Sequence, residues 1–356
     1  MAKLGKPAAA ILIMAAIIAV LLTLCTPRST SRSSSLSAAD SPLPRRRDRE
    51  VAIRVLVLDF DPTIADSNSR PAHQAFGWSD PRVLADGYMA DVAAASGGHI
   101  RYDVVEWRTL NAFPPKRGGY RYSAATYARC LTQTGTCHTP DGLDYERVLS
   151  EQGVARLVDG GAIDEVWLFG GPYFGYFEAA MAGPGAFDIN GDAFVDFPTT
   201  RAFVIMGFNY ERGVAEMLHD LCHRAEATLS RVYGGWDADR LVTTWARFAA
   251  NAHQSNGRAG VGNCHYPPNA TSEYDYANPR AVESDAGDWL RYPARTGKRS
   301  RVTKDTWGGP DYHRNYMRWW FQHLPRADGV GPDGKLANWW TYVTSFYSLV
   351  SRGLTP

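Results

Sequence analysis

The stretch VAIRVLVLDF, residues 51–60, decides the fold class, because apolar and β-branched side chains fill nearly all of it. Such a run, bounded by turn residues, predicts a buried strand. Further along the chain, PRVLADGYMADVAAAS (81–96) carries apolar side chains at helical spacing, and RYDVVEW (101–107) is a second strand-like run. Strands that alternate with helices predict an α/β or α+β fold built on a mixed sheet with packed helices.

The same alternation continues to about residue 235. We expect further strands at 164–169 and 202–206, and a helix at 145–157. These elements together predict a sheet-and-helix domain over residues 51–235.

The pattern changes in residues 236–356, where Gly, Pro and Asn interrupt the apolar runs. Six of the eleven tryptophans fall between 289 and 340, which predicts an irregular, aromatic-rich subdomain packed on the sheet. Paired tryptophans at 319–320 and 339–340 favour burial in a core, and stacking on sugar rings is the alternative. Helices are expected at 238–252, 311–324 and 337–350.

The composition places the chain among folded proteins, with 45 % hydrophobic and 21 % charged residues. Its formal charge of +1 is unevenly spread: residues 1–50 hold eight Lys or Arg and three Asp or Glu, so the remaining residues are mildly acidic. Nucleic-acid binding needs a clustered basic surface, so we exclude nucleic acid as a partner.

The N-terminus predicts export. Lys3 and Lys6 precede an apolar run to Cys25 that contains no charge, which is typical of a signal-anchor or a signal peptide over residues 1–25. Residues 26–50 are rich in Ser, Pro and Arg and predict a disordered linker. The folded part is therefore expected outside the cytoplasm, held at the membrane by residues 7–25 or secreted after cleavage.

The cysteines agree with export. Apart from Cys25 there are four, which allow three pairings in an oxidising compartment. Cys130 and Cys137 lie seven positions apart in a turn-rich stretch and are expected to close a local loop. That pairing leaves Cys222 to bond Cys264.

The segment FNYERGVAEMLHDLCHRAEATLSRVYGG (208–235) predicts the helix that carries the chemistry. His219 and His223 have the i, i+4 spacing at which two imidazoles can bind one ion. The order HDLCH is similar to the zincin motif H-E-x-x-H, with Asp220 in place of Glu. That similarity implies two zinc ligands and a carboxylate base for metal-bound water.

A third ligand has to come from another segment. The Cys222–Cys264 bond would bring His265, the residue after Cys264, to the histidine pair. Glu216 and Glu226 lie on the same face of the predicted helix, Glu226 as a ligand or as the partner of one, and Glu216 as an alternative base to Asp220. A purely structural histidine pair is the competing interpretation.

Two short motifs suggest other chemistry. The run VLVLDFDPTIADS (55–67) resembles the first motif of haloacid-dehalogenase-like phosphatases, with Asp59 and Asp61 as the nucleophile and the acid/base. Asp192 and Asp196 then resemble the metal motif of that family, but Lys116 is the one lysine between the motifs.

The segment that contains Asp192 also resembles the start of a calcium loop. Asp188, Asn190, Asp192 and Asp196 would offer oxygen ligands at alternating positions. A plain Asn-Gly turn between strands is the alternative interpretation.

A Gly/Pro-bounded aromatic loop follows the strand expected at 164–169. It contains Glu178, a candidate acid/base, beside Tyr173, Phe174, Tyr176 and Phe177. Glycosidases use two carboxylates, so Glu178 together with Glu216 and Glu226 makes a glycan-active enzyme an alternative interpretation.

Several longer blocks together resemble a family of exported bacterial proteins with no established activity. The blocks are VWLFGGPYFGYFEAAMAGPGAF (166–187), MGFNYERGVAEML (206–218), HRAEATL (223–229), NCHYPPN (263–269) and ANWWTYV (337–343). The resemblance covers most of 51–345 and implies an exported α/β domain. Members of the family often carry a carboxylate at the position of His219, which implies that His223, Glu226 and His265 are the more dependable ligands. They also lack the D-x-D pattern at 59–61.

The leading prediction is an exported zinc-dependent hydrolase of zincin type, with a peptidase as the expected activity. Its metal ligands would be His219, His223, His265 and Glu226, and its base Asp220 or Glu216. The substrate would be a polypeptide or a glycan outside the cytoplasm. The alternatives are a non-catalytic glycan-binding module, a glycan-active enzyme and a phosphatase that uses Asp59 and Asp61.

Overall fold

The computed structural model of the chain describes residues 50–64 and 68–350. The signal or anchor segment expected at 1–25 and nearly all of the linker expected at 26–50 lie outside these residues. Within the described ranges, no helix combines the length and the apolar character needed to cross a membrane.

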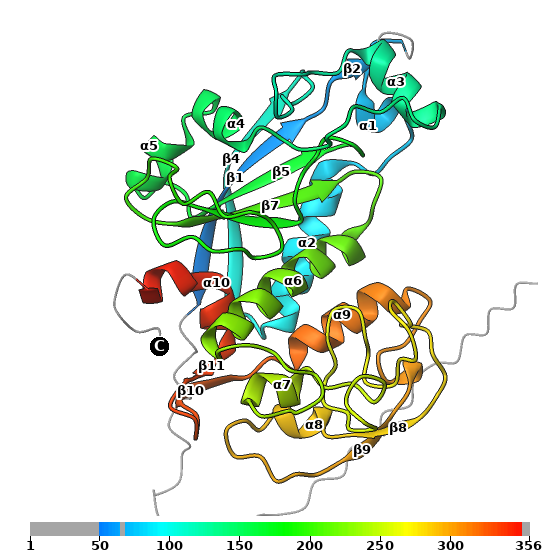
Figure 1. Cartoon of the computed structure of the whole chain (residues 1–356), viewed down its shortest axis with the longest axis vertical. Coiled ribbons are helices and arrows are strands. Elements are labelled where there is room, and N and C mark those ends of the chain that lie inside the picture. The colour runs from blue at the N-terminus through cyan, green and yellow to red at the C-terminus, as the bar shows by residue number, and fades with distance from the viewer. Residues whose placement is uncertain (1–49, 65–67, 351–356) are drawn as a thin grey trace, which may run out of the picture. The chain divides into compact units, whose positions relative to one another are not determined.

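A five-stranded mixed sheet forms the centre of the described part (Figure 1). Its order is β4-β1-β5-β7-β6, in which the first four strands are parallel and β6 runs antiparallel to β7 at one edge. This arrangement confirms the expected class, a mixed sheet with packed helices. The strands are β1 (Val51–Phe60), β4 (Ile100–Leu110), β5 (Glu165–Gly170), β6 (Ala179–Ala182) and β7 (Phe203–Asn209).

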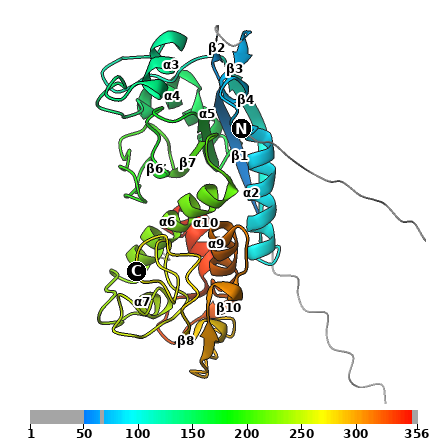
Figure 2. The same cartoon turned by 90° about the vertical axis from the view of Figure 1, so that its right-hand side faces the viewer.

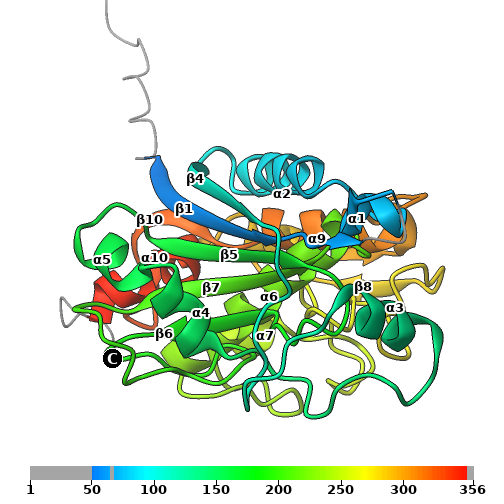
Figure 3. The same ribbon diagram turned by 90° about the horizontal axis from the view of Figure 1, so that it is seen from above.

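Helices cover both faces of this sheet, whose strands Figure 3 shows along their length. Along β1, Val55 and Val57 join the core under α2 and α6, whereas Leu56 and Leu58 join the core under α3, α4 and α5. Because side chains alternate between the faces and both faces are covered, β1 needs apolar residues throughout. The helices are α1 (Ala72–Ala75), α2 (Pro81–Ala95), α3 (Ala124–Thr132), α4 (Tyr145–Glu151), α5 (Val154–Asp159) and α6 (Val214–Val232).

The C-terminal part packs on the side of α6 that faces away from the sheet, as Figures 1 and 2 show. Its tryptophans, except the exposed Trp236, belong to the α2–α6 core or pack against it. Trp319, Trp320, Trp339 and Trp340 are all buried, which confirms the core interpretation of these pairs. Its helices are α7 (Thr244–Phe248), α8 (Ala286–Trp289), the 3₁₀ helix η2 (Lys304–Thr306), α9 (Tyr312–Gln322) and α10 (Trp339–Val350). Three small two-stranded sheets complete the described fold: β2 (Thr63–Ile64) with β3 (Arg70–Pro71), β8 (Val282–Ser284) with β9 (Ser300–Val302), and β10 (Arg326–Val330) with β11 (Leu336–Asn338).

Two expected helices are wrong in extent. The helix expected at 145–157 is two helices, α4 and α5, because Gly153 adopts the left-handed conformation with φ of 63° between them. The helix expected at 238–252 is only α7, whose first turn is capped by the Thr243 hydroxyl accepting the Ala246 N–H.

A buried ion pair anchors α6 to the sheet. Arg224, in the middle of α6, lies 2.7 Å from Glu165 at the start of β5, and both side chains are almost fully buried. Since a buried charge is stable only when it is paired, this contact fixes the rotation of α6 about its axis. The polar face of α6 is thereby directed toward the C-terminal part.

Candidate metal centre

Helix α6 presents two imidazoles one turn apart, as its sequence spacing predicts. The rings of His219 and His223 lie 4.6 Å apart between their centroids, His219 buried and His223 half-buried. Helix geometry places residues i and i+4 on one face, so both rings project from the same side of α6.

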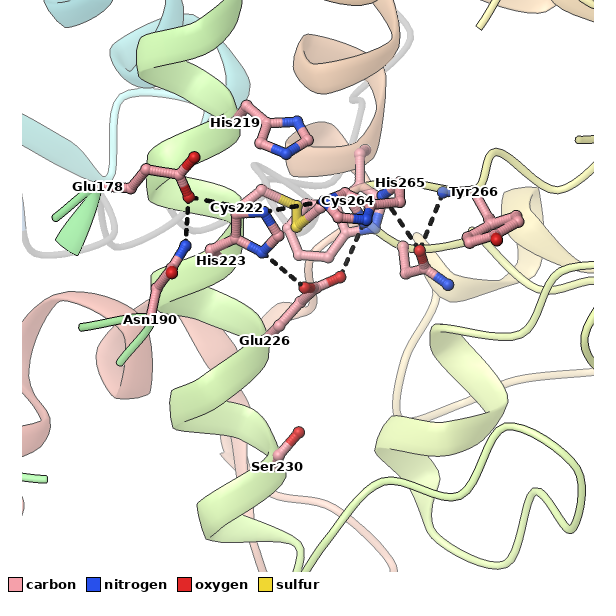
Figure 4. Close-up of polar contacts among 12 residues, drawn as sticks. Glu178, Asn190, His219, Cys222, His223, Glu226, Ser230, Cys264, His265 and Tyr266 are labelled. Carbon is pink, nitrogen blue, oxygen red and sulfur yellow. Dashed lines mark hydrogen bonds and ion pairs between the residues drawn. A yellow bond between two sulfur atoms is a disulfide. The ribbon is translucent and has the colours of Figure 1, made fainter. Parts of the chain in front are cut away.

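A disulfide brings the third imidazole to this pair (Figure 4). Cys222 is bonded to Cys264, with their Cα atoms 5.8 Å apart, and Cys130 is bonded to Cys137. Both expected pairings are therefore present. His265 follows Cys264 directly, and its Nε2 lies 3.2 Å from Nε2 of His223.

The three imidazoles fit the geometry of a metal ion. The ligand nitrogens of His219, His223 and His265 all lie within 4.8 Å of one another. Two zinc–nitrogen bonds of about 2.0–2.1 Å at a tetrahedral angle separate their nitrogens by about 3.3 Å, close to the 3.2 Å between His223 and His265. A small inward movement of His219 would complete a three-histidine site with one position open.

Glu226, expected as a ligand or as the partner of one, contacts His223 and the backbone of Cys264. One oxygen of its carboxylate is 3.2 Å from Nδ1 of His223, and the other accepts the backbone N–H of Cys264 at 2.8 Å. It also groups with Cys222 and Cys264, but their sulfurs are bonded to each other, so they do not offer thiolates to a metal. Its place is that of a carboxylate that orients a ligating histidine.

The other histidines have similar neighbours, which no pattern in the sequence predicts. Nδ1 of His265 faces the Glu273 carboxylate at 3.6 Å. Nδ1 of His219 lies 3.3 Å from both the Tyr276 hydroxyl and Nε2 of His313. His313 comes from α9, and no spacing in the sequence connects that helix with α6.

The environment keeps His219 neutral and therefore able to bind a metal. Burial and, to a lesser extent, the neighbouring imidazoles of His223, His313 and His265 together lower its pKa to about 2. Burial also acts to lower the pKa of His223, but the hydrogen bond and charge of Glu226 outweigh it, so this pKa is raised. The pKa of His313 is lowered, mainly by burial.

Glu178 links the histidines to a cavity. Its carboxylate lies 3.7 Å from Nε2 of His223 and accepts a hydrogen bond from the Asn190 amide (Figure 4). The cavity has a volume of about 250 Å³ and lies at the carboxyl ends of β5 and β7, where α/β sheets commonly bind ligands. Its lining includes Glu178, Glu216, Asp220, Arg212 and Tyr173.

The two candidate bases have different environments. Glu216 accepts the backbone N–H of Gly213 at 3.0 Å and caps the first turn of α6. Asp220 is buried in the cavity wall, and its carboxylate makes no hydrogen bond with another described residue. Burial raises the pKa of Asp220 well above its usual range; the charges of Glu178 and Glu216 add to this, and that of Arg212 opposes it. Asp220 is thus the better placed of the two to exchange a proton with a bound molecule.

The residues of the expected calcium loop have other partners. Asp188 accepts the backbone N–H of Ala193 at 2.9 Å, Asn190 donates to Glu178, and Asp192 forms an ion pair with Arg117. In the described ranges, the groups that can hold a metal do not include them. Calcium at this loop, with Asp196, stays a prediction.

The carboxylates of the phosphatase-like motif form hydrogen bonds with other residues of the fold. Asp59 accepts the Tyr210 hydroxyl and, at 3.2 Å, the Trp107 indole, while Asp61 lies 2.6 Å from His73. Lys116 is buried and bonds Asp141. These contacts give both carboxylates partners within the fold, and the phosphatase stays a prediction.

Comparison of the chain with family models, with curated proteins and with solved structures finds no match. The resemblances to zincins and to the family of exported bacterial proteins therefore stay predictions. What the chain can do has to be argued from the site itself.

Proposed function

We propose that the protein is a zinc-dependent hydrolase that cleaves polypeptides outside the cytoplasm with metal-activated water. The observation that carries this proposal is the convergence of His219, His223 and His265, with 3.2 Å between the Nε2 atoms of the last two. Three protein ligands and one open position are typical of catalytic rather than structural zinc.

The roles follow from the positions of the side chains. Zinc held by the three imidazoles would supply a water activated near neutral pH. Asp220, in the wall of the adjoining cavity, would take the proton that this water loses and return it to the leaving amine. Glu178 stands between the cavity and His223, where it would orient the water or complete the coordination. Glu226 would hold His223 in its ligating orientation.

Export is part of the proposal. Two disulfides within one chain favour an oxidising compartment, which agrees with the apolar segment expected at 1–25. Of the alternatives, glycan stacking by Trp319, Trp320, Trp339 and Trp340 is disfavoured because the core buries them. The phosphatase is disfavoured by the contacts of Asp59 and Asp61.

The test combines metal content with activity. We expect one zinc per chain in the full-length protein, and cleavage of quenched fluorescent peptides that a chelator abolishes and zinc restores. His223→Ala should lose both the zinc and the activity while circular dichroism shows a retained fold. His253→Ala is the matched control, because His253 is an exposed histidine that stacks on Tyr266 outside the cluster.

Each part of the proposal has its own contrary result. Zinc content that is equal in wild-type protein and His223→Ala would refute the metal site. If the protein binds zinc and releases sugars from polysaccharide but does not cleave peptides, the peptidase assignment is refuted and the substrate is a glycan.

A further inference from the structure

A second cavity lies in the C-terminal part and shares no lining residue with the one beside the histidines. It has a volume of about 190 Å³. Its wall is formed by α7, by the loop that precedes Val261, and by the residues that flank β8 and β9. Three of its eight lining residues are arginines: Arg247, Arg258 and Arg299.

Two of these arginines are held in place by backbone carbonyls. Arg247 donates from Nε to the carbonyl of Leu241 and from Nη2 to that of Val242, both at 3.1 Å. Arg258 donates from Nη2 to the carbonyl of Asp239 at 2.9 Å. Neutral carbonyls fix the direction of a guanidinium but leave its positive charge uncompensated.

The acidic lining residue, Asp285, does not neutralise the arginines. One of its oxygens is 2.5 Å from Arg295, and the other accepts the Trp289 indole N–H at 3.1 Å. Arg295 therefore compensates part of its charge, although Arg295 also faces Asp288 at 3.6 Å. Arg299 stands one position before Ser300, which pairs with Ser284 across β8 and β9, so Arg299 lies opposite Asp285 at the cavity. Its guanidinium has no hydrogen bond or ion pair with any residue that the structure describes.

Three like charges around one cavity repel one another, and a bound anion would relieve that repulsion. Apart from Arg295 and Arg299, the surrounding segment 291–304 contains four lysine or arginine residues and no acidic residue, which adds to the positive potential. Guanidinium groups bind the oxygens of phosphate and sulfate through paired N–H donors. All three arginines are exposed, and the carbonyl contacts already orient two of them, Arg247 and Arg258, which lowers the cost of binding.

We propose that Arg247, Arg258 and Arg299 form a binding site for a tetrahedral oxyanion of the phosphate or sulfate class. The ligand is a free ion or the charged group of an ester, and both present the same oxygens to the three guanidiniums. This site is independent of the proposed zinc chemistry, because none of its residues contacts the histidine cluster.

The test is calorimetric titration of the full-length protein with inorganic phosphate and, in parallel, with a sugar phosphate. We expect saturable binding of one anion per chain. Arg299→Gln should weaken phosphate binding at least about tenfold, the loss expected of a charge-assisted contact, without affecting the fold, since Arg299 has no partner in the described structure to lose. Lys298→Gln is the matched control. It removes the same charge from the residue next to Arg299, and Lys298 does not line the cavity.

The outcomes distinguish a specific anion-binding site from non-specific attraction by the surface charge. Unchanged binding in Lys298→Gln and weaker binding in Arg299→Gln support the site, and tighter binding of the sugar phosphate than of free phosphate assigns the ester as ligand. Equal weakening in the two variants, or no saturable binding of either probe, would overturn the proposal.

Discussion

Replacing Glu226 by Gln should weaken zinc binding although Glu226 does not touch the metal. Its two oxygens accept two N–H groups, Nδ1 of His223 at 3.2 Å and the backbone N–H of Cys264 at 2.8 Å. A carboxylate accepts both donors, whereas an amide has one oxygen and one NH₂ group. In Glu226→Gln, one of the two N–H groups must therefore face another donor, at His223 or at the backbone that carries His265.

The size of the effect follows from burial and from the double contact. The Glu226 side chain is only 11 % exposed, so solvent screens these contacts weakly. Loss of such a partner of a ligating histidine weakens metal binding about 10- to 100-fold, which is about 1.4–2.7 kcal/mol. We expect the upper half of this range, because the same carboxylate orients one ligand and the loop of a second.

The assay is competition for zinc with a chromogenic chelator near pH 7.5, on protein whose fold is checked by circular dichroism. Glu273→Gln is the matched control. The Glu273 carboxylate lies 3.6 Å from Nδ1 of His265 but is 55 % exposed, so its loss should change the zinc affinity less than about fivefold. A Glu226→Gln affinity within twofold of wild type, or equal losses in both variants, would refute the assigned role of Glu226.

Three further predictions concern the elements that hold the site. Replacing both Cys222 and Cys264 by Ser should lower the free energy of unfolding by about 4 kcal/mol, since the bond closes a loop of 42 positions, and should reduce the zinc content. Arg224→Leu should destabilise the protein by about 3–5 kcal/mol in urea unfolding, because it leaves the buried Glu165 carboxylate without its partner. Burial lowers the pKa of His323 to about 4, so its folded form stays neutral where the unfolded chain binds a proton. The stability that this residue contributes above pH 6.5 should therefore be lost as the pH falls toward 4, by about 3 kcal/mol, and His323→Gln should show a correspondingly smaller loss.

Each of these predictions has a control or a contrary result. Replacing Cys130 and Cys137 by Ser removes a loop of only seven positions, which should lower stability by about 2 kcal/mol and leave zinc binding unchanged. Zinc loss in that variant would argue against a specific role for the Cys222–Cys264 bond. Arg224→Leu protein as stable as wild type would show that the ion pair does not anchor α6. An identical pH dependence of unfolding in wild type and His323→Gln would contradict the low pKa of His323.

The strands and the site helix could be predicted because their signals are local. The apolar run of β1 and the helical spacing in α2 and α6 each lie within one segment, and the structure has these elements close to the expected bounds. The contact between His265 and α6 is a long-range feature that was still predictable. With four cysteines and one evident local pair, Cys222 and Cys264 were left to bond each other.

Other parts of the site depend on tertiary packing that leaves no pattern in the sequence. His313 reaches His219 because α9 packs on α6, with 94 positions between the two residues. Glu178 comes near His223 because the short strand β6, only four residues long, pairs antiparallel with β7. Its sequence, AAMA, has no alternation that would predict a strand. The boundary between α4 and α5 depends on the backbone conformation of a single glycine, Gly153.

The most direct test of the zinc site is anomalous diffraction at the zinc edge from crystals of the protein grown with zinc. The account predicts one strong peak about 2 Å from Nε2 of both His223 and His265, with the His219 ring moved toward it. The absence of a peak among the three imidazoles, or a peak only at another place such as the Asp188–Asp196 loop, would contradict it.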